Sequence, residues 1–346
     1  MNFTNISIEN FRGIRKCTLS GLGLVNIFFG KNNCGKSSLL ESIFLMCGPS
    51  NPTLPIVVNN MRSLMSFTEE DLRAEFYGLN PENEILITGQ GDQKREVRIG
   101  MITSHSKQIQ LDRLTQQNAD QAGKRYGFKI NFSAGEDGRV YHTELVVGEE
   151  NSGKATTDKL YKESLYAEYI PSGYMMLNVN EKLAQVIKNK KENDILEALR
   201  LVEPRIKDIQ LLDKKIMVDI GLEERLPINV LGDGVRKVLS ILLSIHNAQN
   251  GVLMVDEIDN GLHYSVMPDL WKVILHSCRK LNTQLFVSTH SMDMVKALVA
   301  AMLEVGAQDN DVSAFKLIKK NDDELAALRY GIAELSYAVE QELEVR

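Results

Sequence analysis

The sequence predicts an α/β fold in which a parallel or mixed β-sheet is covered by helices. Near both ends of the chain, apolar runs of strand length alternate with helical segments, and the runs at 24–29, 251–255 and 284–287 are almost continuously apolar. Strands that are apolar on both faces are typical of parallel sheets buried between helices. A third observation, a series of short strand-like segments between residues 84 and 150, predicts a β-rich insertion.

The composition argues against several other classes of protein. The 346 residues include 40 Lys and Arg and 46 Asp and Glu, a formal net charge of −6. No apolar run reaches the roughly 18 residues of a membrane helix, and the N-terminus shows no signal or transit pattern, so we expect no membrane association and a cytoplasmic location. The four cysteines lack the spacing of a disulfide framework or a zinc site. The mild acidity leaves only local basic patches for contact with nucleic acid.

The first 60 residues are expected to contain two strands and one helix. Residues 3–10 alternate in polarity like a half-buried strand, and the second strand, at 24–29, leads into a glycine-rich turn. Residues 38–47 have the apolar spacing of a helix, and three prolines between residues 48 and 60 end it.

The middle of the chain is expected to change from strands to helices. Turn residues separate four β-rich runs, EILITGQ (84–90), REVRIGMITS (95–104), YGFKINFSA (126–134) and RVYHTELVVG (139–148). The polar segment 151–159 is expected to be a loop. Residues 180–209 are expected to be helical, because their apolar residues recur three and four positions apart.

The last third returns to alternating strands and helices. Helices are expected at 237–249, 264–281 and 291–306, beside the apolar strands described above. The chain continues for 346 − 290 = 56 residues after His290. These residues are expected to be helical and charged, without a cluster of metal-ligating acids.

A phosphate-binding loop is predicted between the strand at 24–29 and the helix that follows it. Gly30, Gly35, Lys36 and Ser37 fit the pattern G-x-x-x-x-G-K-[ST] in full. Glycines let consecutive backbone N–H groups point at phosphate oxygens, and the helix N-terminus adds partial positive charge. Lys36 would contact the β- and γ-phosphates, and the Ser37 hydroxyl would bind Mg²⁺. The expected nucleotide-binding residues are Gly30, Lys31, Asn32, Asn33, Cys34, Gly35, Lys36, Ser37 and Ser38.

Two acids and a histidine follow the apolar strands of the last third. Asp256 and Glu257 end the strand that starts at residue 251, at the sheet edge where open α/β proteins hold their ligands. Asp256 can hold Mg²⁺, usually through water, and Glu257 can accept a proton from the attacking water. His290 ends the next strand, where it could reach the γ-phosphate or orient the water, or instead cap the following helix.

A second glycine turn, at Gly232 and Gly234, stands at the mouth of the helix at 237–249. Glycines at a helix N-terminus favour anion binding. One phosphate loop does not need a second such turn within the same chain. The turn therefore suggests closure over a nucleotide held by another subunit, which would make the catalytic site composite and dimer-dependent.

The order of the motifs resembles the ABC-type ATPase heads, most closely the SMC/RecF/OLD-like branch. The motifs that carry this resemblance are ISIENFRGI, GKNNCGKSS, LGDGVRK, VLMVDEIDNGLH and FVSTHS. The segment GVLMVDEIDNGLHYSVMPDLW and the terminal EVR look like the stand-alone OLD-like AAA ATPases of prokaryotes, several of which serve anti-phage modules beside a nuclease or effector subunit.

This resemblance implies a P-loop head that is split along the chain. Residues 1–60 would form its N-terminal part, 61–180 a β-rich lobe, 181–225 a helical segment, and 226–346 its C-terminal part. ATP, with Mg²⁺, would be sandwiched between the phosphate loop of one subunit and the signature of another, giving a homodimer or a higher homo-oligomer.

The resemblance also assigns roles to residues, and one of them departs from the family. Asp259 falls on the D-loop acid, His290 on the switch histidine, and Asn10 and Arg12 on the N-terminal strand and its nucleotide-facing arginine. Gly232, Asp233 and Gly234 fall on the signature LSGGQ, but Gly232 replaces the serine that bonds the partner's γ-phosphate, and an acid follows. This departure favours slow turnover or stabilisation by a partner. Three glutamines, Gln90, Gln108 and Gln110, are candidates for the Q-loop residue.

The first functional hypothesis is therefore an Mg²⁺-dependent ATPase whose nucleotide state regulates assembly with a separate effector, in anti-phage defence. No Toprim nuclease domain has room after His290, so a nuclease would be another chain. The alternative is a RecF-like or SMC-like DNA-binding ATPase of DNA repair, for which the basic patches are 94–98, 188–191 and 316–320. An ABC transporter subunit is disfavoured by the missing signature serine and the large insertion.

Overall fold

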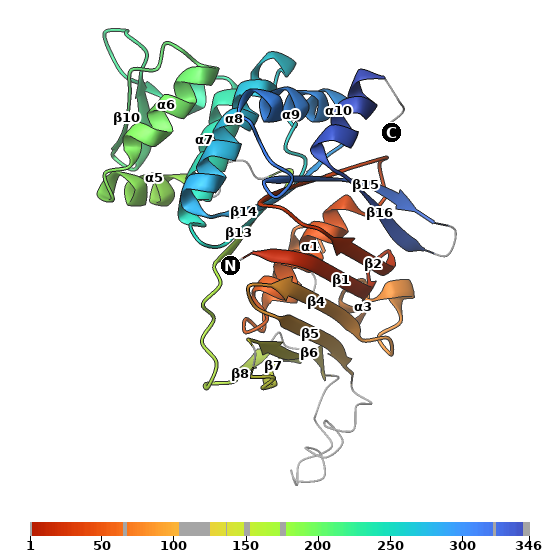
Figure 1. Cartoon of the computed structure of the whole chain (residues 1–346). Helices are drawn as coiled ribbons and strands as arrows, with labels where there is room; N and C mark the ends of the chain where they lie inside the picture. Colours follow the sequence, from red (N-terminus) through yellow and green to blue (C-terminus); the bar gives the residue numbers. More distant parts are fainter. Residues whose placement is uncertain are drawn as a thin grey trace.

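The structure is a computed structural model that describes residues 2–64, 68–103, 125–135, 137–148, 153–173, 178–320 and 323–341. Most of its strands form one large mixed sheet, and three short strands form a second sheet (Figure 1). In spatial order the large sheet contains β8 (Gly153–Thr157), β7 (Tyr141–Gly148), β6 (Arg125–Ala134), β5 (Arg95–Ile102), β4 (Ile85–Gly91), β1 (Phe3–Phe11), β2 (Ile14–Ser20), β16 (Glu324–Tyr330), β15 (Val312–Lys319), β3 (Val25–Phe29), β14 (Gln284–Thr289), β13 (Val252–Val255) and β9 (Ala167–Ile170). The small sheet contains β10 (Asp208–Leu212), β11 (Lys215–Asp219) and β12 (Leu226–Pro227).

The large sheet has a parallel part and an antiparallel part. The strands β15, β3, β14, β13 and β9 run parallel to one another, whereas all neighbours from β8 to β2 are antiparallel. Val255 pairs with both Val287 and Ile170, so the carboxyl ends of β13, β14 and β9 lie at one edge. This mixed sheet confirms the predicted fold class.

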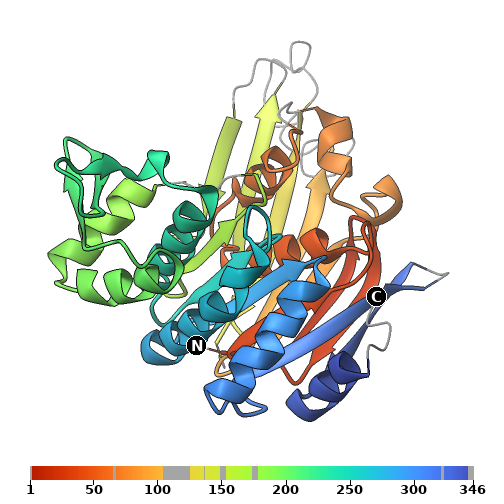
Figure 2. The ribbon, with the colours of Figure 1, turned by 90° about the horizontal axis from the view of Figure 1, so that it is seen from above.

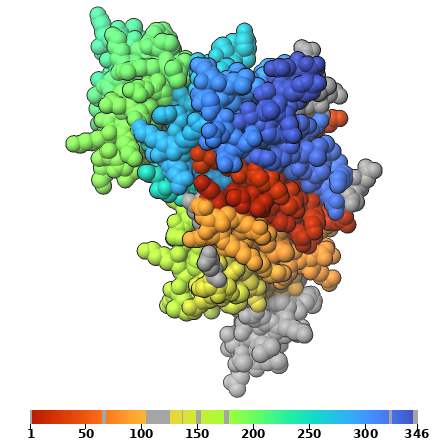
Figure 3. All heavy atoms as spheres, in the orientation of Figure 1, coloured from red at the N-terminus to blue at the C-terminus, as the bar shows by residue number. Residues whose placement is uncertain are grey.

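Helices cover both faces of the parallel part of the sheet. In chain order they are α1 (Lys36–Cys47), α2 (Leu54–Asn60), α3 (Glu69–Arg73), α5 (Val179–Lys188), α6 (Glu192–Val202), α7 (Asp233–Asn247), α8 (Met267–Leu281), α9 (Met292–Glu304) and α10 (Ile332–Glu340). Figures 1 and 2 show α7 to α10 together on one face of the parallel strands, with α1 on the opposite face. In the space-filling view of Figure 3, residues of about 180–225 form a lobe beside the C-terminal helices.

Alternate residues of the parallel strands serve two hydrophobic cores, because side chains alternate across a strand. Ile27 and Leu253 belong to the core beneath α5 to α10, whereas Phe28 and Met254 belong to the core that contains α1 and the antiparallel strands. All four side chains are buried. Burial on both faces explains the continuous apolar runs from which the parallel strands were predicted.

The structure corrects three expectations about secondary structure. Residues 180–209 are not helical throughout, because α6 ends at Val202 and β10 begins at Asp208. The predicted loop 151–159 contains β8, whose five residues are all exposed and which is held by its backbone pairing with β7. An exposed edge strand carries no alternation of polarity, so the pattern did not reveal it. The chain after residue 306 is not helical throughout, because β15 and β16 form a hairpin within it.

The predicted β-rich lobe, 61–180, does not stand apart from the head as a separate sheet. Its strands β4 to β8 extend the large sheet through the pairing of β4 with β1. Its last strand, β9, instead pairs in parallel with β13 at the opposite end of the sheet. Among the described residues, no helix is long and apolar enough to span a membrane.

Candidate functional site

A cleft of about 540 Å³ lies at the carboxyl ends of the parallel strands. It is the place where most of the predicted site residues meet. The residues that line it are Arg12, Gly13, Asn32, Asn33, Cys34, Gly35, Lys36, Ser37, Ser38, Arg62, Asp256, Glu257, His290 and Lys319. The sheet order causes this meeting, because β3, which leads into the phosphate loop, pairs with β14, and β14 pairs with β13.

The phosphate loop has the backbone shape that its glycines predict. Gly30 has φ 149° and Gly35 has φ 101°, both in the region that favours glycine. A Cβ atom at Gly30 would lie 2.7 Å from the carbonyl oxygen of Leu317, so no larger residue fits. Lys36 lies almost buried beneath the loop, and its Nζ donates to the carbonyls of Gly30 and Lys31 at 3.0 and 2.9 Å. The loop and its lysine are thus mutually ordered.

Asp256 is nearly buried, and neighbouring strands orient its carboxylate. Its Oδ1 accepts a hydrogen bond from the Ser288 hydroxyl of β14, and its Oδ2 accepts one from Tyr169 of β9 at 3.4 Å. The Ser37 hydroxyl lines the same cleft. A carboxylate and a hydroxyl are hard oxygen ligands, and hydrogen bonds that orient a ligating carboxylate are typical of cation sites. This donor set fits Mg²⁺.

Glu257 lies beside Asp256 in an uncommon backbone conformation, with φ 48°. Its N–H donates to the Ser288 hydroxyl at 2.8 Å, and its Oε2 accepts a hydrogen bond from the Asn260 amide at 2.9 Å. The positive φ turns the chain directly after the strand. The carboxylate consequently lines the cleft next to Asp256, where it can act as a proton acceptor.

His290 reaches the cleft from the end of β14, and about half of its side chain is exposed. Its Nε2 lies 3.5 Å from Oδ2 of Asp259. Asp259 is itself held by the Thr289 hydroxyl, which donates to its Oδ1 at 2.6 Å. Asp259 does not line the cleft and contacts His290 from outside it.

Two basic residues in the cleft were not predicted as site residues. Arg62 donates to Glu41 at 2.7 Å and to the Ser38 hydroxyl at 3.0 Å, and so holds α1 from outside the loop. Lys319 belongs to the basic run 316–320, for which the sequence suggests only a DNA-binding patch. Neither residue lies in a recognised motif, and no local pattern distinguishes them from surface cations.

Arg12 lines the cleft and is also engaged in a network with Glu41 of α1. Its Nε lies 2.9 Å from Oε2 of Glu41, and its guanidinium donates to the Asn59 side chain at 3.1 Å. The backbone N–H of Arg12 donates to the carbonyl of Glu75 at 2.8 Å. Burial lowers the pKa of Arg12, although Glu41 and Glu75 oppose this shift. The network fixes the β1–β2 turn against the phosphate-loop helix.

Glu75 predicts a measurable pH dependence of stability. Its side chain is fully buried, neither carboxylate oxygen has a hydrogen-bond partner among the described residues, and burial raises its pKa to about 8. The folded state therefore binds a proton that the unfolded state releases near pH 4.5, and the contribution of this group to stability falls as pH rises towards 8. We expect Glu75→Gln to remove a slope of up to about 1.4 kcal/mol per pH unit from the free energy of unfolding.

Urea denaturation of both proteins between pH 5 and 8 measures this slope. Glu70→Gln, a change at an exposed glutamate of α3, is the control and should leave the slope unchanged. Equal slopes for wild type and Glu75→Gln would show that Glu75 is ionised in the folded protein.

Several predicted residues lie outside the cleft. Asn10 donates its side-chain amide to the carbonyl of Glu84 at 3.2 Å and does not line the cleft. Gln90 lies in β4, paired with Asn5 of β1, and also does not line the cleft. Gln108, Gln110 and the terminal segment 344–346 lie outside the described residues.

The glycine turn also lies outside the cleft of its own chain. Gly232 is the N-cap of α7, and a Cβ atom built on it finds no atom within 4 Å. Asp233 is largely exposed and pairs with Arg236 at 2.8 Å, which offsets the negative charge of this acid. A Cβ at Gly234 would lie 3.8 Å from Leu262, so the glycine turn and the chain after Asp259 are neighbours on the surface.

Comparison with known proteins agrees with this geometry. A family model described as "AAA domain, putative AbiEii toxin, Type IV TA system" matches residues 25–293. An ATP/GTP phosphatase of Helicobacter pylori is 24% identical over 324 residues, which are 85% of this chain and 86% of that protein. A RecF DNA replication and repair protein of Acinetobacter baylyi is 44% identical over 46 residues, 13% of each chain.

Solved structures of Smc heads have the same fold. An Smc head bound to the C-winged helix domain of ScpA aligns with a TM-score of 0.52 at 13% identity, covering 97% of this chain and all of that one. An Smc head with an extended coiled coil, bound to the C-terminal domain of ScpA derived from Pyrococcus furiosus, aligns with a TM-score of 0.50 at 11% identity, covering 98% of this chain and 99% of that one. At such identities the likeness shows the fold alone.

The matched residues 25–293 make up most of the chain and contain the phosphate loop, the glycine turn, both acids and the histidine. The chain therefore belongs to the family described as AAA domain, putative AbiEii toxin, Type IV TA system, and it has an SMC-head-like fold.

Proposed function

We propose that the chain binds ATP in the described cleft, hydrolyses it with the help of Mg²⁺, and does so in a dimer whose formation regulates a protein partner. The observation that carries the proposal is the meeting of Lys36, Asp256 and Glu257 in one cleft at the carboxyl ends of the strands. Open α/β proteins hold their ligands at this edge. The relative of Helicobacter pylori that bears the name ATP/GTP phosphatase supports a hydrolytic reaction.

Each residue of the cleft has a role that follows from its chemistry. Lys36 would exchange its carbonyl partners for the oxygens of the terminal phosphates. Glu257 would accept the proton of the attacking water, and His290, oriented by Asp259, would donate a hydrogen bond to the γ-phosphate. Mg²⁺, held by Ser37 and Asp256, would neutralise the charge that develops on the phosphates.

A second copy of the chain would complete this site. The cleft is open, and the glycine turn at Gly232–Gly234 lies on the surface outside it. Val230 and Tyr264, both about two-thirds exposed, stand in the two segments that meet at the glycine turn. Exposed apolar side chains beside an anion-binding turn support a surface that is covered when ATP is bound.

Substitution of Gly232 tests the composite site. Gly232 has φ −59° and open space around it, so Gly232→Val should fold normally and bind ATP as a monomer. We expect this variant to lose ATP-dependent dimerisation and to turn over at least about tenfold more slowly, because the added side chain blocks approach to the partner's phosphates. Size-exclusion chromatography with and without ATP, together with phosphate release, provides the measurement.

A mixing experiment then distinguishes a composite site from a general defect. Gly232→Val and Lys36→Ala subunits, each impaired alone, can form a mixed dimer with one intact site. Recovery of hydrolysis on mixing is expected. Continued inactivity of a mixed dimer that demonstrably forms would contradict the composite site.

The regulated partner is proposed to be the effector of a defence or toxin–antitoxin module. The support is the family description, which includes a toxin of a type IV system. Among the described residues no group of three or more His, Cys, Asp and Glu side chains is arranged to hold a metal ion. Co-purification with the product of the neighbouring gene, with and without ATP, tests this role.

The second candidate is a DNA-binding ATPase, favoured by the short match to RecF. The basic patches give the DNA-binding hypothesis only limited support. Arg95 is buried and paired with Glu163, Arg98 pairs with Glu96, and Lys319 lies in the cleft. Of the three patches, 188–191 therefore offers the clearest exposed positive charge.

DNA binding can be decided by its salt dependence. We expect the isolated chain to show no retention of duplex DNA at about 150 mM salt, because a chain with a net charge of −6 has no broad basic excess to attract phosphates. Fluorescence anisotropy of a labelled duplex between low and physiological salt measures this. Tight binding that weakens steeply with salt, and that ATP strengthens, would favour the RecF-like function.

A further inference from the structure

A row of polar residues runs along one side of α7. Lys237, Ser240, Ser244 and Asn247 recur three and four positions apart, the spacing that places side chains on one helix face. The first three are 4%, 3% and 0% exposed, in a helix whose other buried residues are almost all apolar. Buried polar groups destabilise a protein unless they form hydrogen bonds, so the hydrogen-bond partners of these side chains indicate the role of the row.

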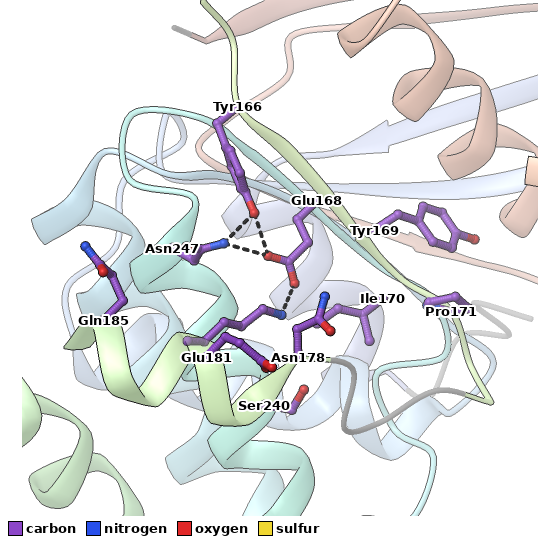
Figure 4. A pocket seen from close by; sticks show the side chains of 11 residues that line it. Tyr166, Glu168, Tyr169, Ile170, Pro171, Asn178, Glu181, Gln185, Ser240 and Asn247 are labelled. Atoms are coloured by element: carbon purple, nitrogen blue, oxygen red, sulfur yellow. Dashed lines mark hydrogen bonds and ion pairs between the residues drawn. The ribbon is translucent and has the colours of Figure 1, made fainter. Parts of the chain in front are cut away.

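The C-terminal half of the row faces β9 across a polar pocket of about 580 Å³ (Figure 4). There Glu168 of β9 accepts hydrogen bonds from the Ser244 hydroxyl at 2.7 Å and from the Asn247 amide at 3.3 Å. Lys182 of α5 forms an ion pair with the same carboxylate. This half of the row fastens α7 to the edge of the large sheet.

The N-terminal half of the row faces the turn that follows β13. Lys237 Nζ donates to the carbonyl oxygens of Glu257 and Asn260 at 2.7 and 2.8 Å. Burial lowers the pKa of Lys237 to about 8, against the opposing effect of nearby acids. A buried ammonium group is costly, and here it is satisfied by two backbone carbonyls of one short turn.

That turn needs support from outside itself. Glu257 has φ 48°, a conformation that non-glycine residues adopt rarely and keep only where surrounding contacts impose it. The Ser288 hydroxyl of β14 holds the N–H of Glu257, and Lys237 of α7 holds its carbonyl. The position of the Glu257 carboxylate therefore depends on two elements that are distant in sequence, and one of them is the helix that begins at the glycine turn.

We propose that Lys237 is a positioning residue for the proton acceptor Glu257, linking α7 and its glycine turn to the active-site turn. The inference rests on the proposed function, in which Glu257 activates water and the glycine turn meets a second subunit. Any movement of α7 on contact with that subunit would reach Glu257 through the two hydrogen bonds of Lys237. ATP binding itself does not need this link, because Lys237 does not line the cleft.

The experiment measures kcat and the affinity for ATP separately in four variants. Lys237→Met removes the donors at nearly constant volume, and Lys237→Arg keeps them. Lys182→Met is the matched control, because it removes another largely buried lysine near the same row without touching the Glu257 turn. Glu257→Gln reports on the chemical step. Affinity is measured with a fluorescent ATP analogue, and turnover by phosphate release.

We expect Lys237→Met to lower kcat at least tenfold while the dissociation constant for ATP changes less than threefold. Lys237→Arg should recover most of the turnover, and Lys182→Met should stay within threefold of wild type. If Lys237→Met does not fold, Lys237→Leu, which also removes the donors, is judged by the same criterion.

The possible failures are distinguishable. Unchanged kcat in Lys237→Met, or a loss found only in ATP affinity, overturns the role of Lys237 while the proposed function stands. A wild-type protein that hydrolyses no ATP overturns the proposed function itself. A Glu257→Gln protein as active as wild type overturns the role of Glu257 as proton acceptor, and with it the role of Lys237.

Discussion

Glu257→Gln is expected to lower kcat for ATP hydrolysis by about 10²- to 10⁴-fold, the usual contribution of a positioned general base. The amide cannot accept the proton of the attacking water, but it occupies the same volume and can still bond the Asn260 side chain. ATP binding should therefore persist, since Lys36 and the loop are untouched. The bound nucleotide would then hold subunits together, and the variant should accumulate as a dimer or larger assembly.

Light scattering coupled to chromatography, with and without Mg²⁺ and ATP, measures the assembly, and phosphate release measures the rate. Glu340→Gln, at the exposed end of α10, serves as a control that should behave like wild type in both assays. Hydrolysis by Glu257→Gln at the wild-type rate would show that another group accepts the proton.

Lys36→Ala is expected to weaken ATP binding roughly 10- to 100-fold, the value of a charge-assisted hydrogen bond in a partly buried site. Lys36 is 8% exposed and already ordered by the carbonyls of Gly30 and Lys31. When a phosphate oxygen replaces these carbonyls as the partner of Lys36, the side chain is already ordered. Binding then costs little additional conformational entropy. Removal of Lys36 should abolish both ATP-dependent dimerisation and hydrolysis.

Isothermal titration with ATP gives the affinity of this variant directly. Lys296→Ala removes an exposed lysine of α9 outside the cleft and should leave the affinity unchanged. Wild-type affinity in Lys36→Ala would mean that the nucleotide does not bind at the phosphate loop. The thermal unfolding of both variants should be compared, because Lys36 also stabilises the loop.

Glu257→Gln and Lys36→Ala distinguish the hydrolysis step from ATP binding. Lys237→Met and Gly232→Val test how contact between subunits controls hydrolysis. If all four behave as expected, one subunit supplies the nucleotide cleft and the other supplies the surface that activates it. The Lys237 link would then explain how contact at the glycine turn reaches a carboxylate that lies on another segment of the chain.

The parts of the site that depend on local chemistry could be predicted from the sequence. A loop of glycines between an apolar strand and a helix has few alternative uses, so the phosphate loop was evident from residues 30–37. Asp256 and His290 were predicted at one edge because apolar strands flanked by helices run parallel and end together. The same reasoning correctly predicted the mixed sheet and its two layers of helices.

The remaining features depend on contacts between segments that are far apart in the chain. No pattern around Arg62 or Lys319 reveals that they line the cleft, and nothing around Lys237 shows that its partners are backbone carbonyls twenty residues away. The strand β8 was missed because an exposed edge strand is held by backbone pairing, which produces no alternation of polar and apolar residues in the sequence.

The sequence by itself therefore determined the kind of site, since short motifs encode phosphate and proton chemistry locally. Only the tertiary structure decided which side chains complete that site, because strand order and helix packing set their neighbours.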